Sequence, residues 1–180
     1  MSVILYAFML SGMITLVSPD PSTGINTGIN ELKVGSEVPE FILPDQNGKM
    51  FDLRRVLGKE NVVIYFYVKD ETPGCTKEAC TFRDDYTQFQ KDNAVVIGIS
   101  AQSVKSHKEF AEKYNLPFTL LSDGKNRVRR LFGVKDVMGS IPGRETFVVD
   151  KQGKIVYIFN SNSKPVEHVT EAMRILNGLS

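Results

Sequence analysis

Two cysteines, Cys75 and Cys80, are the residues of this chain whose type and position indicate chemistry. Both follow residues 62–68, a nearly continuous apolar run that is typical of a central strand covered on both faces. Thr72 can then cap a helix, and Pro73 suits its first turn. A thiol in that turn faces free backbone N–H groups and the positive end of the helix dipole, which favour the thiolate. The sequence therefore predicts that Cys75 is a reactive nucleophile.

The spacing of the two thiols restricts how they can react with each other. Cys75 falls on the inward face of the predicted helix 73–91, so an inert buried cysteine is the alternative interpretation of its position. Cys80 lies about 140° round an intact helix from Cys75 and about 7.5 Å along it. A disulfide requires Cα atoms within about 7 Å and facing Cβ vectors. A bond between the two thiols would therefore require the start of the helix to unwind, with Gly74 and the cap as the hinge.

Other chemistries find less support in the sequence. A Cys-x4-Cys metal site needs further ligands, and His107 and His168 each lie alone on a predicted helix, where we expect surface or edge positions. There is no glycine-rich phosphate loop, Ser-His-Asp order or paired-carboxylate pattern. We therefore expect neither a metal nor a cofactor. The formal net charge of +1 gives no reason to invoke nucleic acid, and the basic residues Arg127, Arg129 and Arg130 are interpreted as a solvated helix face.

The first part of the chain differs from the rest. Residues 2–17 carry no charge, and residues 19–35 are rich in turn-forming types. The apolar run is shorter than the ~20 residues of a bilayer span, so we interpret residues 1–18 as a signal-like or membrane-anchor segment. A wrongly assigned start and an apolar segment docked on the protein are the alternatives. A signal would place the protein in a periplasm or lumen, or on a membrane; otherwise we expect it in the cytoplasm.

One folded domain is predicted over residues 36–180. Hydrophobic content of 42% and charged content of 24% are ordinary for a soluble globular protein. Helical and buried-strand patterns alternate before a final hairpin and helix, which predicts a three-layer α/β domain with a mixed sheet. The predicted elements are strands at 62–68, 94–100 and 118–121, hairpins around 45–48 and 150–153, and helices at 73–91, 104–114, 126–132 and 166–176. Residues 135–143 are predicted to be an irregular loop.

The sequence around the cysteines resembles that of the peroxiredoxins, and specifically of the peroxiredoxin Q or bacterioferritin comigratory protein type. The strongest match is the run YFYVKDETPGCTKEACTFRD at residues 65–84. The resemblance covers roughly residues 32–179, which is nearly everything after the linker. Its further matching segments are residues 43–48, 96–100, 106–110, 116–123 and 142–150.

The resemblance implies a thioredoxin-like fold and a thiol-dependent peroxidase that reduces hydrogen peroxide and organic hydroperoxides in antioxidant defence. Cys75 matches the family's peroxidatic cysteine and Cys80 its resolving cysteine. Thr72 matches the hydroxyl residue of the active-site motif, and Arg144 the arginine before a late strand. The implied cycle makes a sulfenic acid on Cys75 and then a Cys75–Cys80 disulfide, which thioredoxin or a similar dithiol reduces. We expect a monomer.

One position departs from the family pattern. The active-site proline four residues before the threonine is replaced by Val68, which places the rigidity of this loop in question. Without the resemblance, Arg144 could equally be a salt-bridge residue at a strand edge. Two other functional classes remain as alternatives: a thioredoxin-type protein dithiol/disulfide oxidoreductase, and a non-catalytic binding protein with two inert thiols.

Overall fold

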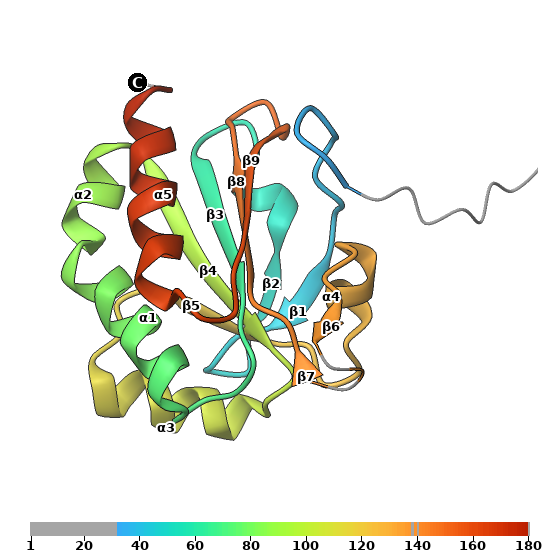
Figure 1. Cartoon of the computed structure of the whole chain (residues 1–180), viewed down its shortest axis with the longest axis vertical. Helices are drawn as coiled ribbons and strands as arrows, with labels where there is room; N and C mark the ends of the chain where they lie inside the picture. The colour runs from blue at the N-terminus through green and yellow to red at the C-terminus, as the bar shows by residue number, and fades with distance from the viewer. Residues whose placement is uncertain (1–31, 138, 140, 180) are drawn as a thin grey trace, which may run out of the picture.

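A five-stranded mixed sheet lies at the centre of the protein, in the order β5-β4-β3-β8-β9 (Figure 1). The computed structural model describes residues 32–137, 139 and 141–179. Strands β3, β4 and β5 run parallel, whereas β8 is antiparallel to β3, and β9 to β8. The predicted α/β class with a mixed sheet is confirmed. The five strands are β3 (Asn61–Phe66), β4 (Ala94–Ser100), β5 (Thr119–Ser122), β8 (Glu145–Val149) and β9 (Ile155–Asn160).

Two layers cover the faces of this sheet (Figure 1). One face carries four helices: α1 (Pro73–Asp84), α2 (Tyr86–Lys91), α3 (Val104–Tyr114) and α5 (Pro165–Asn177). The other face carries the hairpin of β1 (Ile42–Pro44) and β2 (Met50–Asp52), the short 3₁₀ helix η1 (Leu53–Arg55) and α4 (Arg127–Leu131). This arrangement confirms the three-layer α/β domain that the sequence pattern predicts.

The central position of β3 explains why its sequence is apolar after Asn61. All six of its residues are buried. Successive side chains of a strand point to opposite faces, so Val63 and Tyr65 pack among the helices while Ile64 and Phe66 pack toward the hairpin and α4. Both faces of β3 are therefore covered, as expected for a strand with a nearly continuous apolar sequence.

Two local features differ from the prediction, and a third agrees with it. The helix predicted at 73–91 is two helices, because at Asp85 the backbone departs from helical angles (φ −96°, ψ 4°). The loop predicted at 135–143 contains two short antiparallel strands, β6 (Asp136–Val137) and β7 (Ile141–Pro142). The hairpin predicted around residues 45–48 is confirmed, with Gly48 at a φ of +77°.

The predicted segment 1–18 and most of the predicted linker 19–35 lie outside the described residues, so the division of the chain into three parts stays a prediction. Within the described residues, no helix is both long and apolar enough to cross a membrane.

Both histidines are buried, so the prediction of surface or edge positions is wrong. His168 on α5 lies with Nε2 2.8 Å from the Ser161 carbonyl oxygen and Nδ1 2.8 Å from Thr146 Oγ1. Because a carbonyl only accepts, Nε2 carries the hydrogen, and Nδ1 of the neutral ring accepts from the threonine hydroxyl. Both ring nitrogens of His168 thus form hydrogen bonds with residues outside its helix, which its position in the sequence does not indicate.

His168 should make the protein sensitive to acid. Burial lowers its pKa from 6.5 to about 4, although the hydrogen bond to Ser161 acts in the opposite direction. Between these two values the unfolded chain binds the extra proton, so the free energy of unfolding should fall by about 3 kcal/mol as the pH drops from 6.5 to 4.

The measurement is urea unfolding across this pH range, with His168→Gln as the comparison because glutamine keeps hydrogen-bonding groups but does not titrate. We expect the variant to lose most of this pH dependence. Parallel curves for the two proteins would contradict the assignment.

Candidate active site

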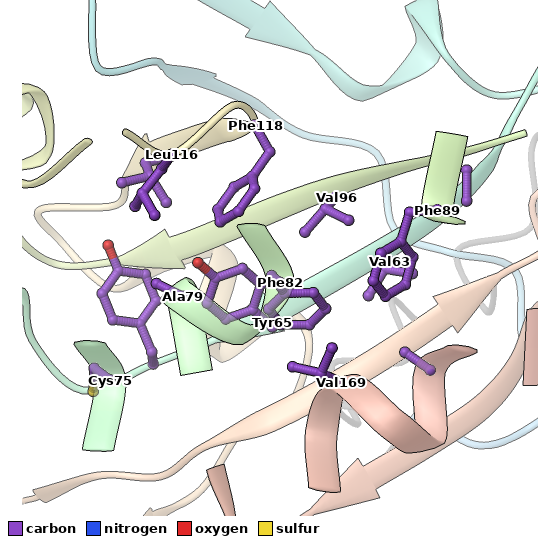
Figure 2. Packing of buried hydrophobic residues seen from close by; sticks show 14 of the residues in the cluster. Val63, Tyr65, Cys75, Ala79, Phe82, Phe89, Val96, Leu116, Phe118 and Val169 are labelled. Atoms are coloured by element: carbon purple, nitrogen blue, oxygen red, sulfur yellow. The ribbon is translucent and has the colours of Figure 1, made fainter. Parts of the chain in front are cut away.

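Cys75 is the third residue of α1, and its side chain is buried at one end of an aromatic cluster (Figure 2). Behind it, Tyr65 stacks on Phe82 with ring centroids 4.7 Å apart. Thr72 is the N-cap residue with extended backbone, and its carbonyl accepts the first helical hydrogen bond from Thr76 N at 2.8 Å. The predicted start of the helix is therefore confirmed.

The hydroxyl of Thr72 does not cap the helix as the sequence predicts. Its Oγ1 instead donates to the carbonyl oxygen of Lys69 at 3.1 Å, within the turn that precedes the helix. The threonine therefore helps to shape the loop before α1, and its side chain stays half-buried beside the helix start.

Arg144 reaches Cys75 from a segment 69 residues away, with Nη2 3.2 Å from the sulfur Sγ. Its other terminal nitrogen, Nη1, donates to the carboxyl group of Glu78 on the next turn of α1. The arginine is only 3% exposed. Arg144 therefore does not lie at a solvent-facing strand edge but is enclosed between the thiol and a carboxyl group.

Two glycines lie at close approaches near this arginine. A Cβ atom at Gly74 would lie 3.3 Å from Arg144 Nη2, which is tight for an ordinary contact. A Cβ atom at Gly143 would collide with the carbonyl oxygen of Lys135, to which the backbone N–H of Gly143 donates at 3.1 Å. The backbone N–H of Arg144 donates to Asn162 Oδ1 at 2.9 Å. The main chain is thus fixed on both sides of the residue that carries the guanidinium.

Arg129 corrects the prediction of a fully solvated basic face on α4. Arg127 and Arg130 are exposed as predicted, but Arg129 is only 6% exposed. Its guanidinium donates to the carbonyl oxygens of Gly143 at 3.3 Å and Lys135 at 3.0 Å. It also reaches Asp136 Oδ1 at 3.1 Å. Arg129 therefore braces the two-stranded segment that delivers Arg144.

Glu78 is a site residue that the sequence analysis did not identify. It is fully buried, and burial raises its pKa from 4.5 to about 8, while the charge and hydrogen bond of Arg144 act in the opposite direction. Because burial favours the neutral acid near neutral pH, the positive charge of Arg144 remains available to the Cys75 sulfur. Its position in the sequence could have identified it, because Glu78 lies three residues after Cys75 and so falls on the helix face that is predicted to be buried.

Cys80 lies on the same unbroken helix as Cys75. Both cysteines are free thiols; Cys75 is buried and Cys80 half-buried. They are five positions apart on an intact helix, so the structure does not bring the two sulfurs together. Within the described part of the chain, no three histidine, cysteine, aspartate or glutamate side chains are grouped so that they could hold a metal ion. The arrangement suits a thiolate held by a cation at a helix start.

Comparison with known proteins gives consistent matches over the folded region. Residues 34–158 match the AhpC/TSA family. The chloroplastic Peroxiredoxin Q of Triticum aestivum is 51% identical over 159 residues, which cover 88% of this chain and 72% of that protein. The chloroplastic Peroxiredoxin Q of Populus jackii is 46% identical, over 97% of this chain and 82% of that protein.

Solved structures agree with these sequence matches. Peroxidoxin BcpB from Mycobacterium tuberculosis superposes with a TM-score of 0.77 at 36% identity, over 83% of this chain and 99% of that one. A cysteine-to-serine mutant of Peroxiredoxin Q from Xanthomonas campestris gives a TM-score of 0.73 at 32% identity, over 83% and 98% of the two chains. These likenesses confirm the thioredoxin-like fold that the resemblance implies, and the family match over residues 34–158 includes Cys75, Cys80 and Arg144.

Removing the carboxyl group of Glu78 should destabilise the fold. Glu78→Ala leaves the Arg144 guanidinium buried without its acceptor, and loss of one partner of a buried pair costs roughly 3–5 kcal/mol. Glu78→Gln keeps an acceptor oxygen and should cost clearly less. Urea unfolding of the reduced proteins above pH 8, where the carboxyl group ionises, measures the difference. Equal losses in the two variants would show that packing rather than the pair carries the stability.

Proposed function

The chain belongs to the AhpC/TSA family and is a thiol-dependent peroxidase of the peroxiredoxin Q type, and on this premise we propose that Cys75 is the residue that attacks the peroxide. The observation that carries the proposal is the contact of 3.2 Å between Arg144 Nη2 and the Cys75 sulfur at the start of α1. A permanently charged guanidinium beside the sulfur stabilises a thiolate, which is the form that reacts.

The proposed first step balances as a two-electron reduction of the peroxide. The Cys75 thiolate attacks one oxygen of the O–O bond, the bond breaks, and the other oxygen leaves as an alkoxide or hydroxide that takes up a proton. Sulfur is oxidised to the sulfenic acid. Arg144 faces the negative charge that passes from sulfur to the leaving oxygen, and such preorganised donors are worth several kcal/mol. We assign the hydroxyl of Thr72 to orientation of the peroxide.

The proposed second step joins the two cysteines. The Cys80 thiol attacks the sulfenic sulfur of Cys75, water leaves, and a disulfide forms. The start of α1 must unwind for this step, because an intact helix holds the two residues apart. The family implies a peroxide substrate and a thiol reductant. We propose that thioredoxin, or a similar dithiol, reduces the disulfide by exchange.

The alternative functions receive no comparable support. The relatives and solved structures described above are peroxidoxins or peroxiredoxins by name, so a thioredoxin-type protein dithiol/disulfide oxidoreductase is not favoured. A binding protein with two inert thiols is not favoured either, because the guanidinium of Arg144 contacts one of them in a buried site.

Location and oligomeric state are further proposals. The names of the plant relatives place those proteins in the chloroplast, so we propose that residues 1–18 direct this chain to a compartment rather than leave it in the cytoplasm. Cell fractionation with mass spectrometry of the mature N-terminus tests this, and also tests a membrane anchor. We propose a monomer, and light scattering would measure its mass in solution.

The two cysteines should separate the two steps. Cys75→Ser should abolish peroxide consumption, because serine supplies no thiolate. Cys80→Ser should still form one sulfenic acid per chain but should not turn over with thioredoxin. Peroxide consumption and intact-mass measurement follow both variants. Appreciable turnover by Cys75→Ser would overturn the nucleophile assignment, and normal cycling by Cys80→Ser would place the resolving thiol elsewhere.

Arg144→Lys should slow the peroxide step even though the positive charge is retained. A lysine ammonium cannot contact the sulfur and Glu78 at once as the guanidinium fork does, so we expect a loss on the order of a hundredfold in kcat/KM for peroxide. Arg130→Lys on the exposed face of α4 is the matched control and should be unchanged. An equal effect of the two substitutions would remove Arg144 from the reaction.

A further inference from the structure

The loop between β3 and α1 carries two acidic residues that the proposed reaction does not use. Residues 67–72 lead from the end of the central strand to the start of the reactive helix, beside α3 (Figure 1). Glu71 in this loop has a φ of +62°, in the left-handed region that glycine favours. A residue with a side chain keeps such a conformation only where its surroundings enforce it. Contacts with neighbouring elements must therefore hold this loop in place.

Asp70 joins the loop to the first turn of α3. Its side chain is buried, and Oδ2 accepts from Ser106 Oγ at 2.6 Å and lies 3.0 Å from His107 Nδ1. Oδ1 accepts from the Tyr67 hydroxyl at 2.7 Å. The other ring nitrogen of His107 lies 3.2 Å from the carbonyl oxygen of Leu121, so both nitrogens face acceptors. Burial alone would raise the pKa of Asp70, but these hydrogen bonds outweigh it and lower the pKa.

Glu71 joins the same loop to the last turn of α3. Its Oε2 accepts from Lys113 Nζ at 2.7 Å and from the Tyr114 hydroxyl at 3.1 Å. Residues seven apart lie on one face of a helix, about 10.5 Å from each other along its axis. Ser106 with Lys113, and His107 with Tyr114, are such pairs. Asp70 and Glu71, which are consecutive in the loop, therefore bind the first and the last turn of α3 on the same side of the helix.

Helix α3 is itself firmly placed. Phe110 and Ala111 are buried in the same cluster as Cys75 and the central strand. Ser103 caps the start of the helix by accepting from Ser106 N at 3.2 Å, and Asn115 ends it in the left-handed conformation. The loop is thus attached to a helix that the core and β5 hold in place, the latter through His107 and the Leu121 carbonyl oxygen. Helix α1 also contacts α3, because Arg83 Nη1 donates to the Tyr114 carbonyl oxygen at 2.8 Å.

We propose that Asp70 and Glu71 are positioning residues that clamp the loop onto α3 and so hold Thr72 and Cys75 in place for the peroxide step. This inference rests on the proposed function of Cys75. A proline at position 68 would stiffen the loop by restricting its backbone angles, and Val68 does not impose this restriction. The hydrogen bonds of the clamp stiffen the loop instead. The clamp also opposes unwinding at the start of α1, so it should favour the folded site over the form in which the two cysteines meet.

The clamp should act in opposite directions on the two half-reactions. With Asp70→Asn we expect oxidation of Cys75 by hydrogen peroxide to slow at least about tenfold, the change expected when a charged buried hydrogen bond is weakened. Formation of the disulfide from the sulfenic acid should become faster, because the helix start unwinds more readily. A general loss of structure would instead lower both rates. Rapid quenching with an alkylating reagent and intact-mass measurement follow both steps in one experiment.

Three further variants provide a second removal of a contact, a control and a rescue. Ser106→Ala removes one donor from outside the loop and should shift both rates in the same directions by a smaller factor. Lys105→Ala on the exposed side of α3 alters an ion pair with Glu109 that does not touch the loop, and should leave both rates unchanged. Val68→Pro added to Asp70→Asn should restore the peroxide step, because the proline stiffens the loop by another means.

The experiment distinguishes failure of the proposed clamp from failure of the proposed peroxidase function. Absence of oxidation of Cys75 in the unmodified protein would reject the proposed function before any variant is compared. With normal oxidation there, unchanged rates in Asp70→Asn and Ser106→Ala would overturn the clamp. Equal falls in both rates, or failure of Val68→Pro to restore the peroxide step, would overturn it as well.

Discussion

A guanidinium group buried between a thiol and a carboxyl group is the interaction on which the rest of this site depends. A cation removed from water is costly unless its donors find acceptors. Arg144 meets this requirement with the Cys75 sulfur on one side and Glu78 on the other. Both of these residues lie on α1, whereas the arginine precedes β8. The guanidinium of Arg144 can therefore reach the Cys75 sulfur only when α1 and the sheet are packed together as in the folded protein.

Several structural features serve this one contact without touching the reacting atoms. Arg129 holds the main chain before Arg144, and Gly143 allows the carbonyl of Lys135 to approach. His168 joins α5 to Thr146 on β8, two residues beyond the arginine. These contacts hold the main chain on either side of Arg144, from which its guanidinium extends to the sulfur.

The sequence could predict those parts of the fold that depend on local patterns. The apolar run of β3, the Thr-Pro start of α1 and the Asn-Gly hairpin are each encoded within a few residues. Burial of polar side chains could not be predicted in this way, because the partners are distant in the chain. Glu78 is buried against an arginine 66 residues away, and His107 against Asp70, 37 residues away. A basic cluster on a short helix likewise gave no sign that its middle member, Arg129, turns inward.

The packing of α1 has a consequence for the reduction potential of the proposed disulfide. Ala79 and Phe82, which lie near the two cysteines on this helix, are buried in the aromatic cluster. Unwinding the helix gives up part of this packing, so the oxidised protein is penalised relative to the reduced one. Each 1.4 kcal/mol of such a penalty shifts a two-electron potential by about 30 mV toward easier reduction. The hydrophobic core on which the thiol rests thereby helps to determine which cellular reductants can return the enzyme to its starting state.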